Sequence, residues 1–323
     1  MGRHVRILGI GVVVDRYCRG EGPADCSEKV ADVVAVLAHR GKRIRLIHRI
    51  EEMALLSAWE ALAESGIGLP LQNGERVGIA LGVEEGIDAI KARHCLALQS
   101  EGLLGVSPIM FPLTAPNTVT AQVSIALDIR GETFTLCGGQ LSGAAAVGLA
   151  LDVVRQGRAH FMLAGGATSV DRVFLDGLSV AGVQDDGAER DGACMLVLAP
   201  AEDGSGKGDE RTPLLLGYGE GFGIDGVREA VNSCLEDANL FPREVGSVWE
   251  ASPGPMVAAQ YFSKSEVSPT RILSPSADLF SASFPLTVAA AVKEQAGGIG
   301  GPALIVGSDC LGGAAAALVR GVT

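Results

Sequence analysis

The stretch TFTLCGGQLSGAAAVG, residues 133–148, joins a β-prone run, a glycine pair and a run of small residues. This order predicts a strand, a sharp turn and a closely packed helix, the geometry that raises the nucleophile in a nucleophile elbow. The residue raised here would be Gln140. A glutamine amide donates and accepts hydrogen bonds but is neither a nucleophile nor a base at neutral pH. The turn therefore has the shape of a catalytic feature without a reactive side chain.

Other side chains offer little help to such a site. Cys137, three residues before Gln140, is expected to pack on the strand as a buried structural thiol, with a displaced nucleophile as the alternative. None of the five histidines lies after residue 160. Ser252 therefore has no imidazole near it in the sequence to activate it. Adjacent residues on a helix point apart, so His94 and Cys95 do not predict a metal site.

Composition limits the classes of partner. The chain has 323 residues, 47% of them apolar, and a net charge of −12. The negative charge argues against nucleic acid, against anionic membrane surfaces and against direct docking of a strongly acidic carrier protein. Seven scattered cysteines without a C-x-x-C pair fit a reducing cytoplasm. The sequence shows no signal-peptide pattern and no apolar run long enough to span a membrane, so we expect a cytoplasmic protein.

Periodicity predicts elements that alternate between strands and helices. Strands are expected at 5–14, 76–83, 132–137, 160–167, 193–200, 214–223 and 245–252, and within 303–321. Helices are expected at 28–40, 51–66, 85–102, 120–129, 142–157, 225–240 and within 281–297. The alternation indicates an α/β protein with two βα-rich halves, residues 1–167 and 168–323, in one integrated domain.

From Ser107 to Gly166 the chain resembles a β-ketoacyl synthase, the condensing enzyme of fatty acid and polyketide assembly. The resemblance is carried by SPIMFP, by AQVSIALDIRG and by QLSGAAAVGLALDVVRQGRAHFMLAGG. Further segments, RDGACMLVL, SVWEASPGP, SPSADLFSAS and CLGGAAAALV, follow in the family's order. The resemblance implies the thiolase-like fold, two related βα halves in an αβαβα arrangement of five layers.

The sequence departs from the family at the reactive positions. Gln140 stands where members have their cysteine, and Ser252 and Asp278 stand where they have two histidines. Leu273 replaces a lysine and Leu311 a gating phenylalanine. Without a thiolate or an imidazole, neither the thioester nor acid–base assistance is available by this route. The departures therefore predict that the chain is no enzyme on its own.

Glutamine at the cysteine position is similar to the chain-length factors of bacterial type II polyketide synthases. This resemblance implies a heterodimer with an active ketosynthase that performs the condensation, while this chain shapes the acyl tunnel. It also implies that the acyl carrier protein binds mainly through the partner, and that no cofactor or metal is needed. Aromatic polyketide, polyene and specialised fatty acid products all stay open.

The same resemblance assigns residues to the tunnel and to the interface. Asp88, Lys91 and Cys95 fall on one helical face near the positions where chain-length factors gate the tunnel, and Ile109 and Met110 would line it. A solvated helix face is the alternative interpretation of the first three. The strand Thr133, Phe134, Thr135 and Leu136 would pair with its counterpart in the ketosynthase.

Two other functions stay open. A glutamine-type ketosynthase domain that decarboxylates malonyl thioesters is one, although such domains retain the histidines. The other is a homodimeric protein that binds an acyl chain without chemistry. Solubility of the isolated chain and a decarboxylation assay would separate these from the chain-length role.

Overall fold

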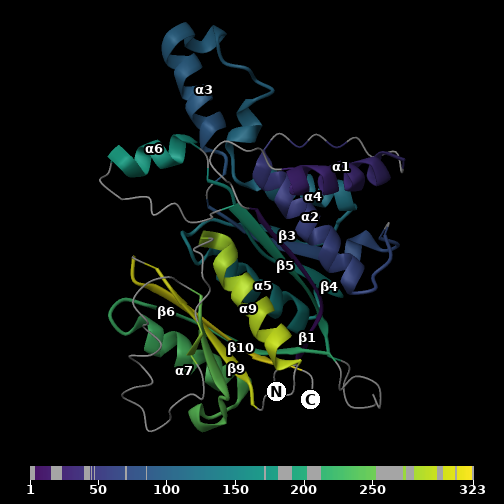
Figure 1. The fold of residues 1–323 in the computed structure, drawn as a ribbon, viewed down its shortest axis with the longest axis vertical. Coiled ribbons are helices and arrows are strands. Elements are labelled where there is room, and N and C mark those ends of the chain that lie inside the picture. Colours follow the sequence, from purple (N-terminus) through teal and green to yellow (C-terminus); the bar gives the residue numbers. More distant parts are fainter. Residues whose placement is uncertain are drawn as a thin grey trace.

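The structure, a computed structural model, describes residues 4–15, 24–39, 44, 46, 48–69, 71–84, 86–170, 172–180, 191–201, 212–251, 272–273, 280–296, 301–309 and 311–321 (Figure 1). The strands are β1 (Val5–Asp15), β2 (Val77–Val83), β3 (Thr133–Leu136), β4 (Phe161–Thr168), β5 (Asp191–Pro200), β6 (Leu214–Phe222), β7 (Ser247–Glu250), β8 (Ile272–Leu273), β9 (Ala303–Ser308) and β10 (Gly313–Arg320). The α-helices are α1 (Ala24–His39), α2 (Arg49–Glu64), α3 (Asp88–Glu101), α4 (Asn117–Leu127), α5 (Ser142–Arg155), α6 (Arg172–Val180), α7 (Gly226–Ala238) and α9 (Ser283–Gln295). Short 3-10 helices are η1 (Gly74–Arg76), η2 (Gly102–Leu104), η3 (Phe111–Thr114), η4 (Pro242–Glu244) and η5 (Phe280–Ala282).

The described strands form one sheet with a repeated order. The order is β3-β2-β4-β5-β1-β6-β10-β9-β7-β8, so each half runs through equivalent strands outward from the centre. The halves meet where β1 pairs with β6 at only two positions, Val5 with Leu215 and Arg6 with Leu214. In each half the outer three strands are parallel, and the strand that follows them inward is antiparallel. This arrangement confirms two related βα halves.

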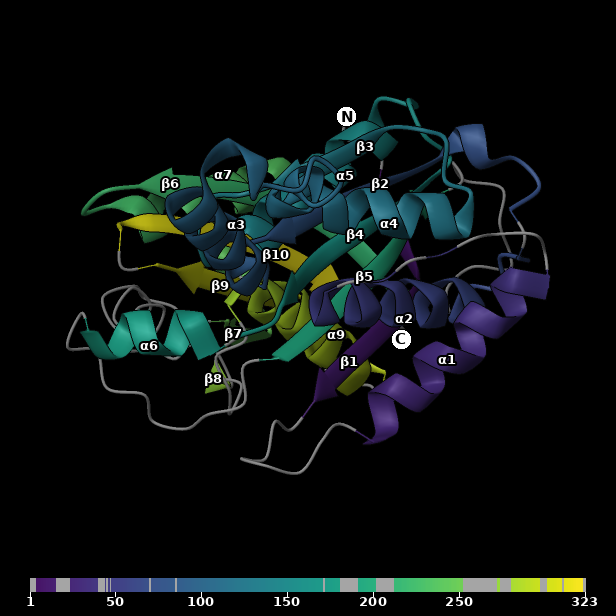
Figure 2. The ribbon, with the colours of Figure 1, turned by 90° about the horizontal axis from the view of Figure 1, so that it is seen from above.

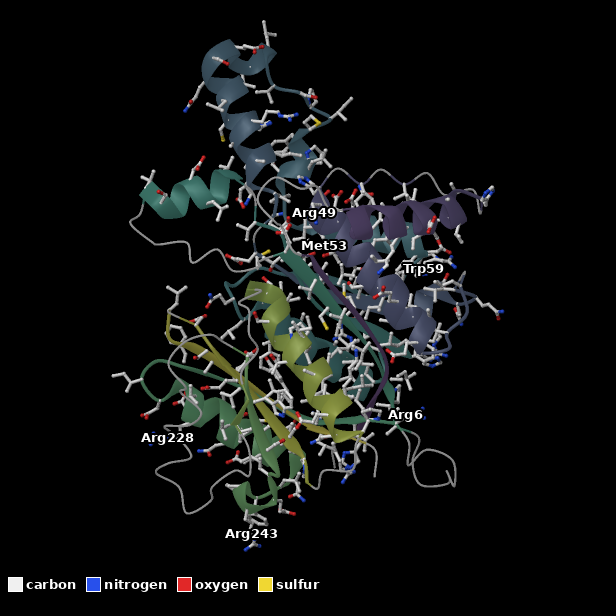
Figure 3. All side chains as sticks on the ribbon, viewed as in Figure 1. Arg6, Arg49, Met53, Trp59, Arg228 and Arg243 are labelled. Atoms are coloured by element: carbon white, nitrogen blue, oxygen red, sulfur yellow. The ribbon has the colours of Figure 1, made fainter. Side chains whose placement is uncertain are left out.

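Three buried apolar clusters define the layers. The first joins α1, α2 and α4 to one face of β1, β2, β4 and β5, and includes Met53 of α2 (Figure 3). The second contains α5 and α9 between the two halves of the sheet. The third packs α7 against β6, β7, β9 and β10. From one outer face to the other, the layers are therefore helices, one half of the sheet, helices, the other half of the sheet, and helices, as Figure 1 shows.

Most predicted elements are present within a few residues of their expected bounds. The helix expected at 120–129 begins earlier, after Pro116, and ends where Asp128 adopts a left-handed φ of 62°. Helix α6 was missed, because its nine residues are too few for a clear helical period. In Figures 1 and 2, α6 and α1 lie at opposite sides of the fold, and in Figure 1 α3 projects beyond its neighbours.

Small residues let backbones touch at the centre. A Cβ on Gly143 of α5 or on Gly166 of β4 would come within 1.9 Å of the Ser281 carbonyl oxygen. A Cβ on Gly82 of β2 would come within 2.3 Å of the Gly143 nitrogen. No side chain fits at such distances, so η5, α5, β2 and β4 approach one another through glycine.

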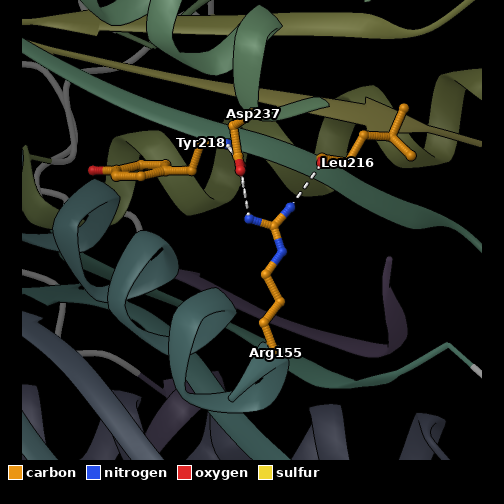
Figure 4. Close-up of polar contacts among 4 residues, drawn as sticks. All are labelled: Arg155, Leu216, Tyr218 and Asp237. Carbon is orange, nitrogen blue, oxygen red and sulfur yellow. Dashed lines mark hydrogen bonds and ion pairs between the residues drawn. The ribbon is translucent and has the colours of Figure 1, made fainter. Parts of the chain in front are cut away.

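An arginine on α5 ties this central helix to the second half of the molecule (Figure 4). Arg155 donates to both oxygens of Asp237 on α7, at 2.9 and 2.7 Å, and to the carbonyl oxygen of Leu216 at 2.9 Å. Asp237 also accepts a hydrogen bond from the Tyr218 backbone N–H. The arginine side chain is only 13% exposed, so solvent screens this fork less than a surface pair.

Replacing this arginine should measurably destabilise the fold. We expect Arg155→Met to lower the free energy of unfolding by about 1–3 kcal/mol, because it leaves the Asp237 carboxylate and the Leu216 carbonyl short of donors. Urea denaturation followed by circular dichroism would measure the change. The matched control is Arg228→Met, whose partner Asp225 is as exposed as Arg228 itself (Figure 3), and which should change stability by less than about 0.5 kcal/mol. Equal losses in the two variants would contradict a special role for the Arg155 fork.

Candidate functional site

The turn between β3 and α5 has the predicted elbow geometry. Gly139 has a φ of 78°, a left-handed conformation that favours glycine. The Ser142 hydroxyl closes the turn, because it accepts from the Gly138 N–H at 2.8 Å and donates to the Gly139 carbonyl at 2.7 Å. The Glu84 carboxylate, just after β2, accepts from the Gly139 N–H at 2.9 Å. The glycine pair and the first residue of the helix therefore build the turn, as the sequence predicted.

The elbow presents its residues differently from the sequence-based expectation. Gln140 is half-buried and is not among the described residues that line the adjacent pocket. Cys137 does line the pocket and is exposed, so the prediction of a buried structural thiol is wrong. The reason lies in the sheet order: β3 ends at Leu136 and is the outermost described strand of its half, so little covers the residue that follows it.

The pocket lies between the elbow and the ends of two strands of the second half. Its volume is about 560 Å³, within the range of small-molecule sites. The elbow side contributes Leu136, Cys137, Gly138, Leu141, Ser142 and Ala145. The opposite side contributes Tyr218, Glu220, Gly221, Phe222, Asp309, Leu311, Gly313, Ala314 and Ala315. The described lining thus combines apolar walls with two carboxylates and contains no lysine, arginine or histidine.

Asp309 shapes the turn before β10. Its Oδ1 accepts from the N–H groups of Leu311 and Gly313, at 2.9 and 2.8 Å. Leu311, at the position of the family's gating phenylalanine, is 73% exposed beside the pocket. On the same side of the pocket, the Tyr218 hydroxyl donates to Glu220 at 2.7 Å, and burial raises the pKa of this tyrosine well above its ordinary value.

The Cys137 thiol is held in its protonated form. Partial desolvation raises its pKa, the negative charge of Glu84 raises it further, and Lys91 on α3 opposes them. A thiol is a poor nucleophile until it ionises. The described residues that line the pocket include no histidine whose imidazole could take the proton of the Cys137 thiol.

The predicted tunnel residues lie together on the projecting part of the fold. Lys91 pairs with Asp88 across 3.3 Å, as their i, i+3 spacing on the helix predicts. Cys95 is exposed, Ile109 is 80% exposed, and Met110 is half-buried. None of these five residues lines the pocket described above, so their tunnel role stays a prediction.

Other predicted positions cannot be placed. Ser252 and Asp278 lie outside the described residues, and Leu273 is described only as part of the backbone of β8. Within the described part of the chain, no group of three histidine, cysteine, aspartate or glutamate side chains could hold a metal ion. None of the helices described there is both long enough and apolar enough to cross a membrane.

Comparisons with known proteins agree with this architecture. Residues 20–204 match the model of the family "Beta-ketoacyl synthase, N-terminal domain". Nodulation protein E of Rhizobium leguminosarum bv. trifolii is 28% identical over 66% of this chain and 59% of its own length. The 3-oxoacyl-[acyl-carrier-protein] synthase 2 of Staphylococcus aureus is 24% identical over 63% of this chain and 58% of its own length. The chain therefore spans less than two thirds of the curated relatives it matches.

A solved structure has the same fold over the whole chain. The ishigamide ketosynthase/chain length factor superposes with a TM-score of 0.79 and 16% identity, covering all of both chains. The predicted thiolase-like fold is thereby confirmed. One expectation is overturned: the staphylococcal relative is a synthase by name, and the match points to an enzyme. The sequence-based prediction that this chain is no enzyme on its own is corrected accordingly.

Labelling of Cys137 should show its raised pKa. We expect its rate of alkylation by iodoacetamide, followed by peptide mass spectrometry, to keep rising at a pH above the midpoint of a small free thiol, because the thiolate forms only there. Glu84→Gln keeps an acceptor for Gly139 and removes the charge, so the rise should shift to lower pH. Gln156→Glu, an added carboxylate at the far end of α5, is the control and should leave the profile unchanged. A Cys137 profile that titrates below a free thiol would contradict this account.

Proposed function

This chain belongs to the beta-ketoacyl synthase family, and we propose that it is one subunit of a condensing enzyme that pairs with a ketosynthase chain and shapes its acyl tunnel. The ketosynthase/chain length factor that shares its fold supports this proposal, since its name joins two such components. In this proposal the acyl carrier protein binds mainly to the partner, because the net charge of −12 disfavours an acidic ligand here.

The free edge of β3 is the observation that carries the proposal. Among the described strands, β3 has a single neighbour, β2, and lies at one end of the sheet. The Ile79 N–H donates to the Glu132 carbonyl at 2.8 Å, so residue 132 turns its backbone groups toward β2. Successive residues alternate, and Thr133 and Thr135 therefore turn their backbone N–H and carbonyl groups outward. An open edge of this kind is a template for a strand of another chain.

A second surface supports an extensive interface. The α3–η2–η3 segment exposes six large apolar side chains: Leu96, Leu98, Leu103, Leu104, Ile109 and Phe111. Single exposed apolar residues scattered over a surface would need no explanation, but six within one segment of sixteen residues indicate an interaction surface. The same segment holds Ile109 and Met110, the residues expected beside the acyl tunnel. A partner that covers this surface would bury apolar area and line the tunnel at once.

Association should depend on the outward backbone of β3. Co-expression with a ketosynthase chain of the same genome that has an intact cysteine and two histidines should give a stable 1:1 complex, with an interface of roughly 2,000 Å² or more. Thr133→Pro should abolish co-purification, because proline removes an outward N–H and spares the ladder to β2. Thr133→Ala keeps that N–H and should co-purify like the unmodified chain. The proposal fails if the proline variant, shown folded by circular dichroism, still forms the complex, or if the unmodified chain behaves as a stable monomer.

The proposed tunnel role predicts changes in product length. A bulkier wall residue should stop chain elongation earlier, and a smaller one should permit longer chains, because overpacking costs about 1–3 kcal/mol. We expect shorter products from Met110→Trp and Cys95→Trp, longer products from Met110→Ala, and a weaker change from Lys91→Ala. Products of the intact complex would be sized by mass spectrometry. Val36→Trp on α1, exposed and remote in sequence from the tunnel segment, is the control. An unchanged product distribution in all four variants would refute the chain-length role.

A further inference from the structure

We propose that Glu220 and Asp309, which line the pocket between the β3–α5 elbow and the ends of β6 and β10, exclude acyl chains that end in a carboxylate. The inference rests on the proposed function in one respect, that acyl chains reach this subunit. It adds two specificity-determining residues.

The apolar lining suits a hydrocarbon chain. Leucine, alanine and phenylalanine side chains from both halves of the molecule face the pocket. Two of the apolar lining residues, Phe222 and Leu311, are 72% and 73% exposed, and Glu220 of the same lining is exposed as well. A methyl-ended chain would gain free energy by leaving water at each step of entry.

The pocket opposes an incoming anion through its charges. Its described lining carries two carboxylates. Glu220 lies on β6, and Asp309 lies on the turn between β9 and β10. No described lining residue is a lysine, arginine or histidine that could neutralise a third carboxylate. Like charges repel at close range, and water screens the half-buried Asp309 less than the exposed Glu220.

Five hydrogen-bond donors around the pocket already donate to groups of the protein itself. The N–H groups of Leu311 and Gly313 donate to Asp309. The Tyr218 hydroxyl donates to Glu220. On the elbow, the Ser142 hydroxyl donates to the Gly139 carbonyl and receives the Gly138 N–H.

The consequence for a ligand follows from these pairings. A carboxylate that enters would meet two carboxylates, and the five donors named above are engaged elsewhere, so they would not compensate its desolvation. A methyl group makes no hydrogen bonds with water, so it loses none when it enters the pocket. The same walls therefore accept an octanoyl chain and reject a chain of equal length whose last carbon is a carboxylate.

Two probes of equal length would test this selectivity on the full chain. The first is octanoyl-pantetheine and the second is its analogue with a carboxylate in place of the terminal methyl. Both carry an amide in place of the thioester, so neither can transfer its acyl group to Cys137. Binding would be read as protection of Cys137 from alkylation, by peptide mass spectrometry. Cys95, which is exposed and does not line the pocket, is the internal control.

We expect the octanoyl probe to protect Cys137 and leave Cys95 reactive. At neutral pH the carboxylated probe should need at least tenfold higher concentration for the same protection. Glu220→Gln and Asp309→Asn keep the size of each side chain and remove its charge, so each should reduce the difference to threefold or less. Asp225→Asn removes one charge outside the pocket lining and should leave the tenfold difference in place.

Equal protection by the two probes in the unmodified chain would overturn the inference. So would a lack of protection by either probe, or a full tenfold difference that persists in both Glu220→Gln and Asp309→Asn. Glu220 lies on a strand and does not cap a turn, so its variant still tests the inference even where Asp309→Asn unfolds the turn before β10. The Thr133→Pro co-purification test gives an independent outcome, so failure of this selectivity and failure of the proposed function are distinguishable.

Discussion

Direct contact between backbones at the centre of the molecule is the constraint on which the rest of the structure depends. The Ser281 carbonyl lies so close to Gly143 and Gly166 that a single methyl group at either glycine would overlap it. This contact brings η5, the first turn of α5 and β4 together, and it joins the two halves of the fold at the point where the elbow leads into α5. The elbow therefore sits on a rigid support made of main chain, which tolerates displacement less than side chains do.

That support determines the polar arrangement around the pocket. With the elbow held in place, Ser142 closes its turn and Glu84 binds the Gly139 N–H. On the opposite wall Asp309 closes the turn before β10 in the same way, with its own carboxylate. Groups of the protein itself thus accept from these donors on both walls. Most of the side chains described around the cavity between them are apolar, and the two charged ones are the carboxylates Glu220 and Asp309. This combination underlies the selectivity proposed for the cavity.

The fold was predictable to a large degree, and the site only in part. Long apolar runs and clear helical periods located β1, β2, α2 and α5, because burial of one face dictates such patterns. The glycine pair at 138–139 located the elbow, because a left-handed turn requires glycine. The exposure of Cys137 was not predictable, since the exposure of a residue at the end of a strand depends on which strand is outermost in the sheet.

By itself, the sequence determined the identity of the elements, the elbow and the family resemblance, since these depend on local pattern and on the order of motifs along the chain. Only the tertiary structure decided which residues share the pocket. Glu220, Asp309 and Cys137 are separated by more than 80 residues from one another, and the folding of the sheet around α5 brings them to one cavity. It also decided that Arg155 meets Asp237, because the contact joins opposite halves of the fold. Such long-range pairings leave no periodic trace in a single sequence, since they arise from the packing of whole layers rather than from neighbouring residues.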